Sequence, residues 1–266
     1  MKAAVVPSEW LRRDCRRFDA GPYTSGAVEA RQLLANLRLR KDRLADLTTG
    51  FNGGIYNGPQ FARHWVDDPA HGVPFLGSSS MLLADLSGLP LLRRRDAESS
   101  KLSYLRISPG TTLISCSGTI GRMVYTRPDM DGMWTSQDIM KVVPDPERIP
   151  PGYLYAFLSS RYGVPLVTSS TYGAIIQHIE PHHLVDLPIP RLDPTVEQDI
   201  HELVESAARL RAKAAVVRRE CVNDIEEALA WSYRSLTSGA RVVNASSLQR
   251  RLDGFHHSAA VASARQ

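Results

Sequence analysis

Hydroxyl-bearing residues and glycines alternate in a short stretch of the chain, SCSGTIGR, at residues 115–122. Gly118 and Gly121 let backbone N–H groups face outward together, an arrangement that suits a phosphate or a base edge. This chemistry is binding rather than catalysis. We expect contacts to DNA phosphate here from four side chains: Ser115, Ser117, Thr119 and Arg122. The alternative is a structural hairpin whose hydroxyls satisfy the turn itself.

Four further segments carry side chains that suit DNA. Gln137 precedes a strand-like run, and a glutamine amide can read adenine bidentately in the major groove; a structural amide is the alternative. The glycine-, asparagine- and aromatic-rich loop 51–65 contains Arg63, and Lys101 follows an arginine run. A polar loop, TSSTYGAIIQ at 168–177, adds Thr171, Tyr172 and Gln177. The alternatives are a packed surface loop at 51–65, a buried Tyr172 whose hydroxyl is satisfied, and a solvated face at Lys101.

Motifs for catalysis are missing from the sequence. It has no G-x-x-x-x-G-K-[ST] loop and no G-x-G-x-x-G. The Asn/Asp-Pro-Pro-aromatic run of aminomethyltransferases is missing too. His178, His182 and His183 cluster, but only Glu180 accompanies them as an acidic neighbour. We therefore expect no catalytic residue, no cofactor and no metal.

The chain has 266 residues, a net charge of +4 and a 43% hydrophobic share, enough for a packed core. Its arginines and lysines gather in clusters that fit a polyanion or form solvated faces: Arg12, Arg13, Arg16 and Arg17; Arg38, Arg40, Lys41 and Arg43; Arg93, Arg94 and Arg95. Three cysteines without CxxC spacing argue against a disulfide framework. With neither a signal peptide nor a membrane span evident, we expect a cytoplasmic protein.

Short elements must position these residues. The sequence predicts strands at 73–76, 112–115, 123–126 and 139–143, helices at 27–40 and 152–160, and a loop at 48–60. The turn at 116–121 would then join two strands. This mixture predicts an α+β domain with short, irregular strands.

A long helix is predicted over 196–231, after Pro194. Its apolar seam repeats at 4-3 spacing over five heptads, which is typical of a coiled coil. The seam positions are Val196, Ile200, Leu203, Ala207, Leu210, Ala214, Val217, Cys221, Asp224, Ala228 and Trp231. No other segment matches it in length and pattern, so we expect its partner outside this chain or in a second copy. The partner-facing residues would be Ile200, Leu203, Ala207, Leu210, Ala214 and Val217.

The two ends of the chain share a pattern. Residues 17–32 read RFDAGPYTSGAVEARQ, and residues 251–266 read RLDGFHHSAAVASARQ. Chance is one explanation. The other is that a second copy of one unit begins at residue 251, which predicts the first half of a two-unit protein or a natural half-length form.

Five ordered segments within residues 44–220 carry a family resemblance: GTTLISCSGTIGRM, WTSQDIMKVVPD, GYLYAFLSS, YGAIIQHIEPHHLVDLPIP and DPTVEQDIHELV. Together with the heptad helix, they resemble the DNA-specificity (S) subunits of type I restriction–modification systems. The resemblance implies a target-recognition domain at 1–192, a long spacer and dimerisation helix at 193–233, and a linker with the start of a second unit at 234–266. It implies a non-catalytic subunit that reads one half of a split site on double-stranded DNA.

The implied partners are methyltransferase subunits, together with a restriction subunit in the full complex. Because the seam lacks a partner in the chain, we also expect a homodimer through the long helix. Two alternatives stay open. One is a coiled-coil scaffold with incidental DNA binding. The other is a recognition domain of a self-contained modification enzyme whose catalytic motifs lie elsewhere.

Overall fold

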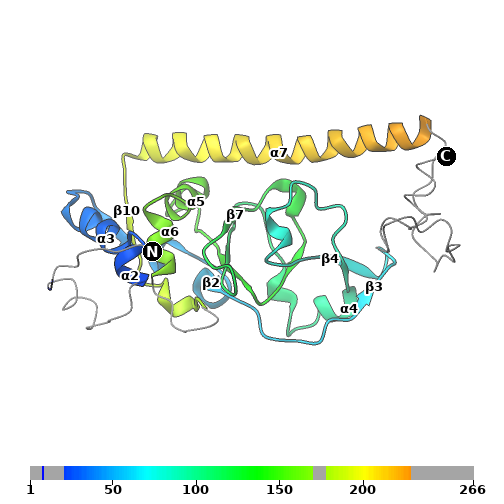
Figure 1. Cartoon of the computed structure of the whole chain (residues 1–266), viewed down its shortest axis with the longest axis horizontal. Coiled ribbons are helices and arrows are strands. Elements are labelled where there is room, and N and C mark those ends of the chain that lie inside the picture. Colours follow the sequence, from blue (N-terminus) through cyan, green and yellow to red (C-terminus); the bar gives the residue numbers. More distant parts are fainter. Residues whose placement is uncertain (1–7, 9–20, 170–177, 229–266) are drawn as a thin grey trace, which may run out of the picture. The chain divides into compact units, whose positions relative to one another are not determined.

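The computed structural model describes Ser8, residues 21–169 and residues 178–228. Contacts divide the chain into two units, Met1–Ala212 and Lys213–Gln266. Among the described residues, the first unit holds the strands and the start of helix α7 (Pro194–Ala228), and the second continues that helix. Figure 1 shows the order of the elements along the chain.

An antiparallel sheet of order β2-β9-β6-β7 carries the SGTIG turn. Its strands are β2 (Ile55–Tyr56), β9 (Ile139–Val142), β6 (Thr112–Ser115) and β7 (Met123–Tyr125). In β6 and β9 every residue is buried, so both faces of these central strands are covered. Ile114 pairs with Met123 on one side and Met140 on the other. This register fixes the turn between β6 and β7 at the end of a rigid sheet.

A second sheet has the order β3-β5-β4-β8. Its strands are β3 (Trp65–Val66), β5 (Leu91–Arg93), β4 (Gly72–Leu76) and β8 (Trp134–Thr135). The pairing of β4 with β8 is parallel, and the others are antiparallel. Because β8 and β9 are separated only by Ser136, Gln137 and Asp138, this short link joins the two sheets.

A small two-stranded sheet pairs β1 (Lys41–Arg43) with β10 (Pro188–Pro190). Pro188 and Pro190 cannot donate to a ladder, and such prolines are found at sheet edges. Leu44 and Arg191 make backbone hydrogen bonds that flank the paired residues, donating to Leu187 and Arg40 at 3.0 and 2.8 Å.

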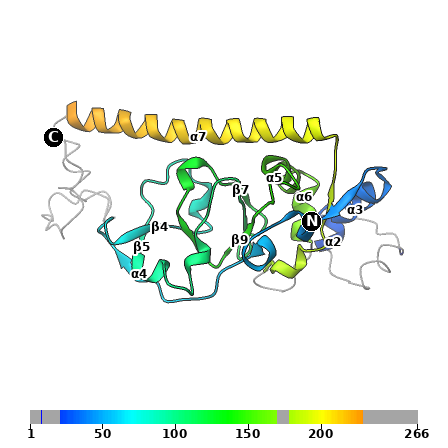
Figure 2. The same ribbon diagram turned by 180° about the vertical axis from the view of Figure 1, so that it is seen from behind.

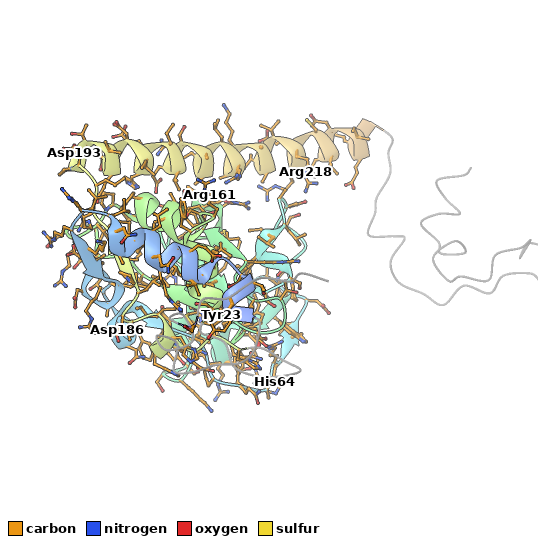
Figure 3. The ribbon with its side chains drawn as sticks, turned by 60° about the vertical axis from the view of Figure 1, so that its left-hand side comes forward. Tyr23, His64, Arg161, Asp186, Asp193 and Arg218 are labelled. Carbon is orange, nitrogen blue, oxygen red and sulfur yellow. The ribbon has the colours of Figure 1, made fainter. Side chains whose placement is uncertain are left out.

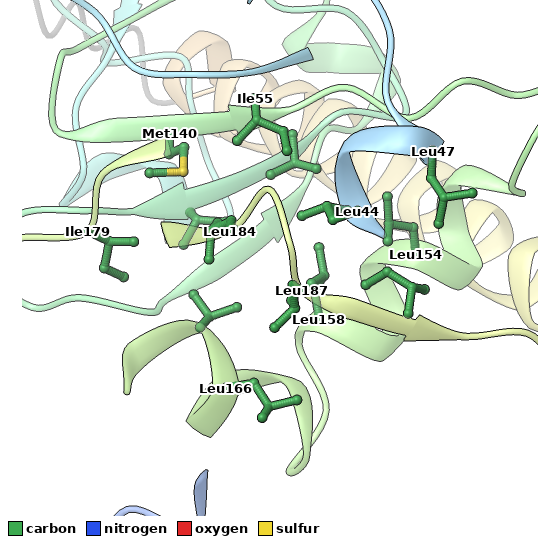
Figure 4. Packing of buried hydrophobic residues seen from close by; sticks show 14 of the residues in the cluster. Leu44, Leu47, Ile55, Met140, Leu154, Leu158, Leu166, Ile179, Leu184 and Leu187 are labelled. Carbon is green, nitrogen blue, oxygen red and sulfur yellow. The ribbon is translucent and has the colours of Figure 1, made fainter. Parts of the chain in front are cut away.

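The largest core cluster is mainly aliphatic and draws on helices, strands and turns (Figure 4). Helices α3 (Ala27–Asn36), α5 (Pro151–Leu158) and α6 (Gly163–Thr168) contribute to it, and the short α2 (Gly21–Thr24) contacts α3. Both views place α2, α3, α5 and α6 at one end of the first unit (Figures 1 and 2). Helix α4 (Arg94–Ala97) lies at the other end, with the second sheet. The described residues also include six 3-10 turns: η1 (Leu44–Leu47), η2 (Phe51–Gly54), η3 (Ser80–Leu82), η4 (Ser103–Leu105), η5 (Pro128–Met130) and η6 (Pro181–His183).

Helix α7 begins with an N-cap, and the buried Glu197 anchors its first turn. The Asp193 carboxylate accepts from the Thr195 N–H at 2.9 Å. Glu197 is 2% exposed, yet it receives Arg191 Nε and Nη2 at 2.9 and 2.7 Å and the Leu192 N–H at 2.8 Å. Arg191 also reaches Asp42 on β1 at 3.0 Å. These bonds tie the start of α7 to the β1-β10 sheet.

One face of α7 is packed, and another is exposed to solvent. His201 accepts from the Gly152 N–H at 3.0 Å, Tyr125 donates to Glu205, and Ala208 is buried, so this face packs within the first unit. The seam positions Leu203 and Leu210 lie nearly half a turn away, given roughly 100° per residue. Leu203 and Leu210 on that seam are 72% and 64% exposed. The helix therefore leaves an apolar stripe open to solvent. Ile200, which was predicted to face a partner, instead packs against the largest core cluster, because it lies next to His201 at the start of the helix.

The α+β class and the long helix agree with the sequence expectation. The strands predicted at 73–76, 112–115, 123–126 and 139–143 are confirmed as β4, β6, β7 and β9, within one residue at each end. The loop predicted over 48–60 is wrong, because η2 and β2 lie inside it. The helix predicted over 27–40 ends at Asn36, since Leu37 adopts an extended backbone. The predicted end of the long helix, Trp231, lies outside the described residues.

The first repeat segment, 17–32, is described only from residue 21, and the second, 251–266, lies wholly outside the described residues. Among the residues with an assigned structure, no helix combines the length and apolarity that a membrane crossing requires.

Candidate nucleic-acid interface

The turn between β6 and β7 uses one of its hydroxyls internally. Ser115 is 1% exposed; its Oγ donates to the Thr119 carbonyl at 2.6 Å and accepts from the Arg122 N–H at 2.9 Å. A Cβ at Gly121, where φ is +78°, would lie 2.4 Å from Thr168 Cγ2, so glycine is required there. Thr119 and Arg122 remain exposed, and Ser117 is half-buried. The part of the turn open to a ligand is therefore 117–119 with Arg122.

The chain after the polar loop returns beside this turn. Ser117 pairs with His178 in an isolated antiparallel bridge, and Ile179 N–H donates to the Cys116 carbonyl at 3.0 Å. Asn57 contacts Glu180 at 3.4 Å, which brings the end of β2 to the same place. Three predicted site residues, Thr171, Tyr172 and Gln177, lie outside the described residues.

Gln137 and Arg63, which are 74 positions apart, are joined by a hydrogen bond. Arg63 Nη2 donates to Gln137 Oε1 at 2.7 Å. The Gln137 carbonyl accepts from the Cys116 thiol at 3.5 Å, and the Cys116 N–H donates to Asp138 at 2.9 Å. Because Cys116 opens the SGTIG turn, the structure brings Gln137, Arg63 and the turn into one neighbourhood.

Lys141 lies next to the link 136–138, which carries Gln137 between β8 and β9, and its sequence context did not single it out. Its side chain is fully buried in β9, and its ammonium donates to the carbonyls of Ser136 at 3.4 Å and Ile139 at 2.9 Å. The ammonium also lies 5.8 Å from the Tyr56 ring centre. Burial disfavours the charged form and lowers the pKa of Lys141 to about 7. The lysine braces both ends of the link that presents Gln137.

Stability should depend on pH through this lysine. Between its folded pKa of about 7 and its ordinary value of 10.5, the unfolded chain binds the extra proton, so unfolding becomes harder as pH rises. We expect the unfolding free energy to gain about 2 kcal/mol from pH 7 to pH 9, at roughly 1.4 kcal/mol per unit. The gain should be lost in Lys141→Met. Urea titrations of both proteins across this range measure it, and parallel curves for the two proteins would contradict it.

Exposed aromatic residues lie next to β2. Phe51 is 50% exposed and stacks on Tyr104 at 3.9 Å with an interplanar angle of 11°. Tyr56 meets both rings edge-on at 5.2 and 5.7 Å and donates from its hydroxyl to the Tyr104 carbonyl at 3.1 Å. The sequence marked this loop only as rich in aromatics, and the stacked pair forms through contacts between distant segments.

The remaining predicted residue, Lys101, is exposed and has no contact with the Arg63–Gln137 pair in the described structure. The neighbouring arginines are engaged locally. Arg93 binds Asp96 at 2.8 Å, and Asp96 also contacts His64 at 2.9 Å. Arg94 reaches the Gly72 carbonyl at 2.9 Å and Glu98 at 3.3 Å. The arginine run therefore braces the second sheet as well as adding charge to its surface.

The histidines after the polar loop make local contacts. His183 Nδ1 accepts from the Glu180 N–H at 3.0 Å, and its ring lies 4.0 Å from that of His182. Within residues 21–169 and 178–228, no group of histidine, cysteine and acidic side chains has a metal-binding arrangement.

No family model and no curated protein matches the chain. Solved structures do match it, and three are similar at low sequence identity. The S subunit of a type I restriction–modification system from M. genitalium is 14% identical, with a TM-score of 0.40, over 64% of this chain and 38% of that one. The HsdS subunit from Thermoanaerobacter tengcongensis is 15% identical, with a TM-score of 0.45, over 80% and 49%.

The third structure concerns complex assembly and conformational transition of a type I restriction–modification system. It is 13% identical, with a TM-score of 0.44, over 83% of this chain and 53% of that one. The chain thus spans between 38% and 53% of the length of these structures. They come from the kind of system that the five sequence segments resemble.

Proposed function

We propose that this chain is a non-catalytic DNA-recognition subunit of a type I restriction–modification complex, which reads one half of a split site. The observation that carries the proposal is the convergence of the SGTIG turn and the Arg63–Gln137 pair around Cys116. Glycine N–H groups, hydroxyls and a cation suit phosphate, while a glutamine beside an arginine suits a base edge. The resemblance of the five sequence segments to S subunits supports the same reading.

The recognition surface would combine positioning and reading groups. Arg122, Ser117, Thr119 and the exposed Lys101 would contact phosphate, and Arg63 with Gln137 would meet bases. Ser115 would act indirectly, since its hydroxyl holds the Thr119 carbonyl and the Arg122 N–H in place. Thr171, Tyr172 and Gln177 stay in the proposed surface on the sequence argument alone.

The partners follow from α7. Its exposed apolar stripe supports docking to a second copy of the chain, and methyltransferase subunits and a restriction subunit would complete the complex. An antiparallel pair of these helices would carry two recognition domains and read a two-fold-symmetric site. The proposed division remains a recognition domain at 1–192, a spacer helix at 193–233 and the start of a further unit at 234–266. We place this activity in the cytoplasm, where host DNA lies.

The second candidate function is a coiled-coil scaffold with incidental DNA binding. The observation that favours it is the same exposed stripe, with Leu203 at 72% and Leu210 at 64% exposure. Sequence selectivity separates the two, because a scaffold binds DNA through charge alone.

Selection from a randomised duplex pool tests the proposed function. The purified chain, alone and with methyltransferase subunits of a type I system, is incubated with the pool, and bound DNA is amplified and sequenced over several rounds. We expect one sequence to be enriched, with two symmetric halves if the chain dimerises. A folded protein that retains DNA without enriching any sequence would support the scaffold instead.

Arg122 should affect all DNA sequences alike. Removing one phosphate contact lowers the slope of log affinity against log salt by about one unit and leaves base preference unchanged. Fluorescence anisotropy with a selected and a scrambled duplex, at several salt concentrations, measures this for Arg122→Ala.

Arg161→Ala provides the matched control for that measurement. Arg161 is also exposed, and it lies 4.7 Å over the Tyr162 ring. Figure 3 labels Arg161 beneath α7 and His64, the neighbour of Arg63 in the sequence, at the far side of the view. The control should keep the wild-type slope. Equal slopes for all three proteins would remove Arg122 from the surface.

A further inference from the structure

The hydrogen bond between Arg63 and Gln137 determines which polar groups remain available on this pair. Arginine carries only donors, so the glutamine atom that faces Arg63 Nη2 at 2.7 Å must be the amide oxygen. The glutamine therefore keeps its NH₂ group for a ligand, and Arg63 keeps its other N–H groups. Neither side chain makes another hydrogen bond to any described residue. Apart from a shared oxygen, the pair offers donors only.

Aromatic rings hold the arginine in position. Its guanidinium lies 5.2 Å from the Phe75 ring centre and 6.0 Å from that of Phe61. Phe75 is 2% exposed on β4, and it meets Phe61 and Trp65 edge-on at 6.1 and 5.5 Å. A planar cation against such a ring is attracted by its π-system. The Arg63 side chain is exposed, but its contacts with these rings restrict its conformation. Less side-chain entropy is therefore lost when it binds a ligand.

The backbone that carries Gln137 is held as firmly. The Cys116 thiol donates to its carbonyl at 3.5 Å, and the Lys141 ammonium binds the carbonyls of Ser136 and Ile139 on either side of it. The Asp138 N–H is received by the Ser136 hydroxyl at 3.3 Å. Both members of the pair therefore keep their relative positions without a ligand.

This arrangement disfavours the adenine contact that a free glutamine would make. Bidentate reading of adenine needs the amide oxygen to accept from N6 while the amide nitrogen donates to N7. At Gln137 the oxygen already faces a guanidinium. An adenine amino group approaching the second lone pair of that oxygen would bring its hydrogens against the cation. Guanine presents two acceptors instead, O6 and N7, and these match two donors.

We infer that the Arg63–Gln137 pair determines specificity by reading one guanine in the major groove through donors alone. This inference rests on the proposed function and deepens it: it names the base that one part of the recognition surface requires. Arg63 and Gln137 would share the guanine, one donating to O6 and the other to N7. Because Arg63 also engages the glutamine oxygen, it sets the preference of Gln137 as well as contacting DNA.

Selection with three proteins tests the inference: wild type, Arg63→Ala and Gln137→Ala. Both variants should alter preference at the same base pair, which in the wild type is G·C. Arg63→Ala should shift that position towards adenine, since it frees the oxygen of Gln137 for bidentate reading. Arg161→Ala is the control and should enrich the wild-type sequence. Thermal unfolding of all four proteins confirms that the variants are folded.

Modified bases give an atom-level reading of the same contact. At the identified position, 7-deazaguanine lacks the N7 acceptor and should bind about 10-fold more weakly or worse, as expected for loss of a base contact. Inosine keeps O6 and N7 and lacks only the minor-groove amino group, so its affinity should match guanine. In Arg63→Ala and Gln137→Ala the penalty for 7-deazaguanine should shrink.

The outcomes separate this inference from the proposed function. An enriched sequence whose Gln137-dependent position is A·T, or variants that alter different base pairs, would overturn the guanine assignment and leave DNA recognition standing. A lack of any enriched sequence would overturn both.

Discussion

Replacing Leu203 and Leu210 with aspartate should give a monomer that keeps a folded recognition domain. These side chains are 72% and 64% exposed, so their loss removes no packing within the first unit. In an antiparallel pair, four leucines would be buried at about 1.5 kcal/mol each or more. Their removal should raise the dimer dissociation constant by about 10⁴-fold. Light scattering at about ten micromolar measures the change.

Leu83→Asp is the matched control for the seam variant. Leu83 is 51% exposed and lies after η3, outside the helix, so this change should leave the dimer intact. Circular dichroism should show the same secondary structure in all three proteins. A wild-type chain that is monomeric at this concentration would remove the homodimer from the proposal and leave DNA recognition untouched.

Glu197→Ala should be the most destabilising single change at the start of α7. The substitution leaves Arg191 and the Leu192 N–H without their partner, although Arg191 keeps its bond to Asp42. Breaking a buried ion pair on one side costs about 3–5 kcal/mol. Urea denaturation of the whole chain measures the loss.

Glu202→Ala, one turn further along α7, is the control for that change. Glu202 is exposed and, among the residues that the structure describes, accepts only from Gln198, at 3.1 Å, so its removal should cost less than about 0.5 kcal/mol. Equal losses for the two variants would mean that the Arg191–Glu197 pair does not fasten the helix.

The elements that could be predicted from the sequence are those with strong local signals. Strand β6, TLIS, is an apolar run that stops at a glycine turn, and α7 shows apolar spacing over 35 residues. Strands of two or three residues, such as β2, β3 and β8, carry no period that can be recognised. Strand β10 reads Pro-Ile-Pro, and prolines disfavour a strand in the sequence because they cannot donate to a ladder.

Buried charges were the least predictable feature of the fold. Lys141 and Glu197 look like ordinary surface residues in the sequence, yet they are 0% and 2% exposed. Their partners are carbonyl groups of a short link in one case and an arginine in the other. Such partners come together only when the sheets and the helix are assembled, so composition and spacing contain no sign of them.

The candidate site was predicted as a set of residues and not as an arrangement. Gln137 and Arg63 were both expected to contact DNA, but their hydrogen bond depends on the link between two sheets. Ser115 was expected at the surface, and its hydroxyl is instead consumed by the turn, as the alternative reading had it. On α7, the seam was predicted while the packed face with His201, Glu205 and Ala208 was not. Two of these three residues are polar, so no apolar period marks that face.

Relative affinity for one DNA sequence tests the central proposal most directly. The chain, assembled with methyltransferase subunits, is titrated with the duplex obtained by selection and with a scrambled duplex of equal length and composition. Sequence-specific recognition predicts an affinity ratio of about 10³ or more at 0.15 M salt. That ratio should persist as salt weakens both complexes. Equal affinities for the two duplexes at every salt concentration, with folded protein, would contradict the proposal that this chain recognises DNA sequence.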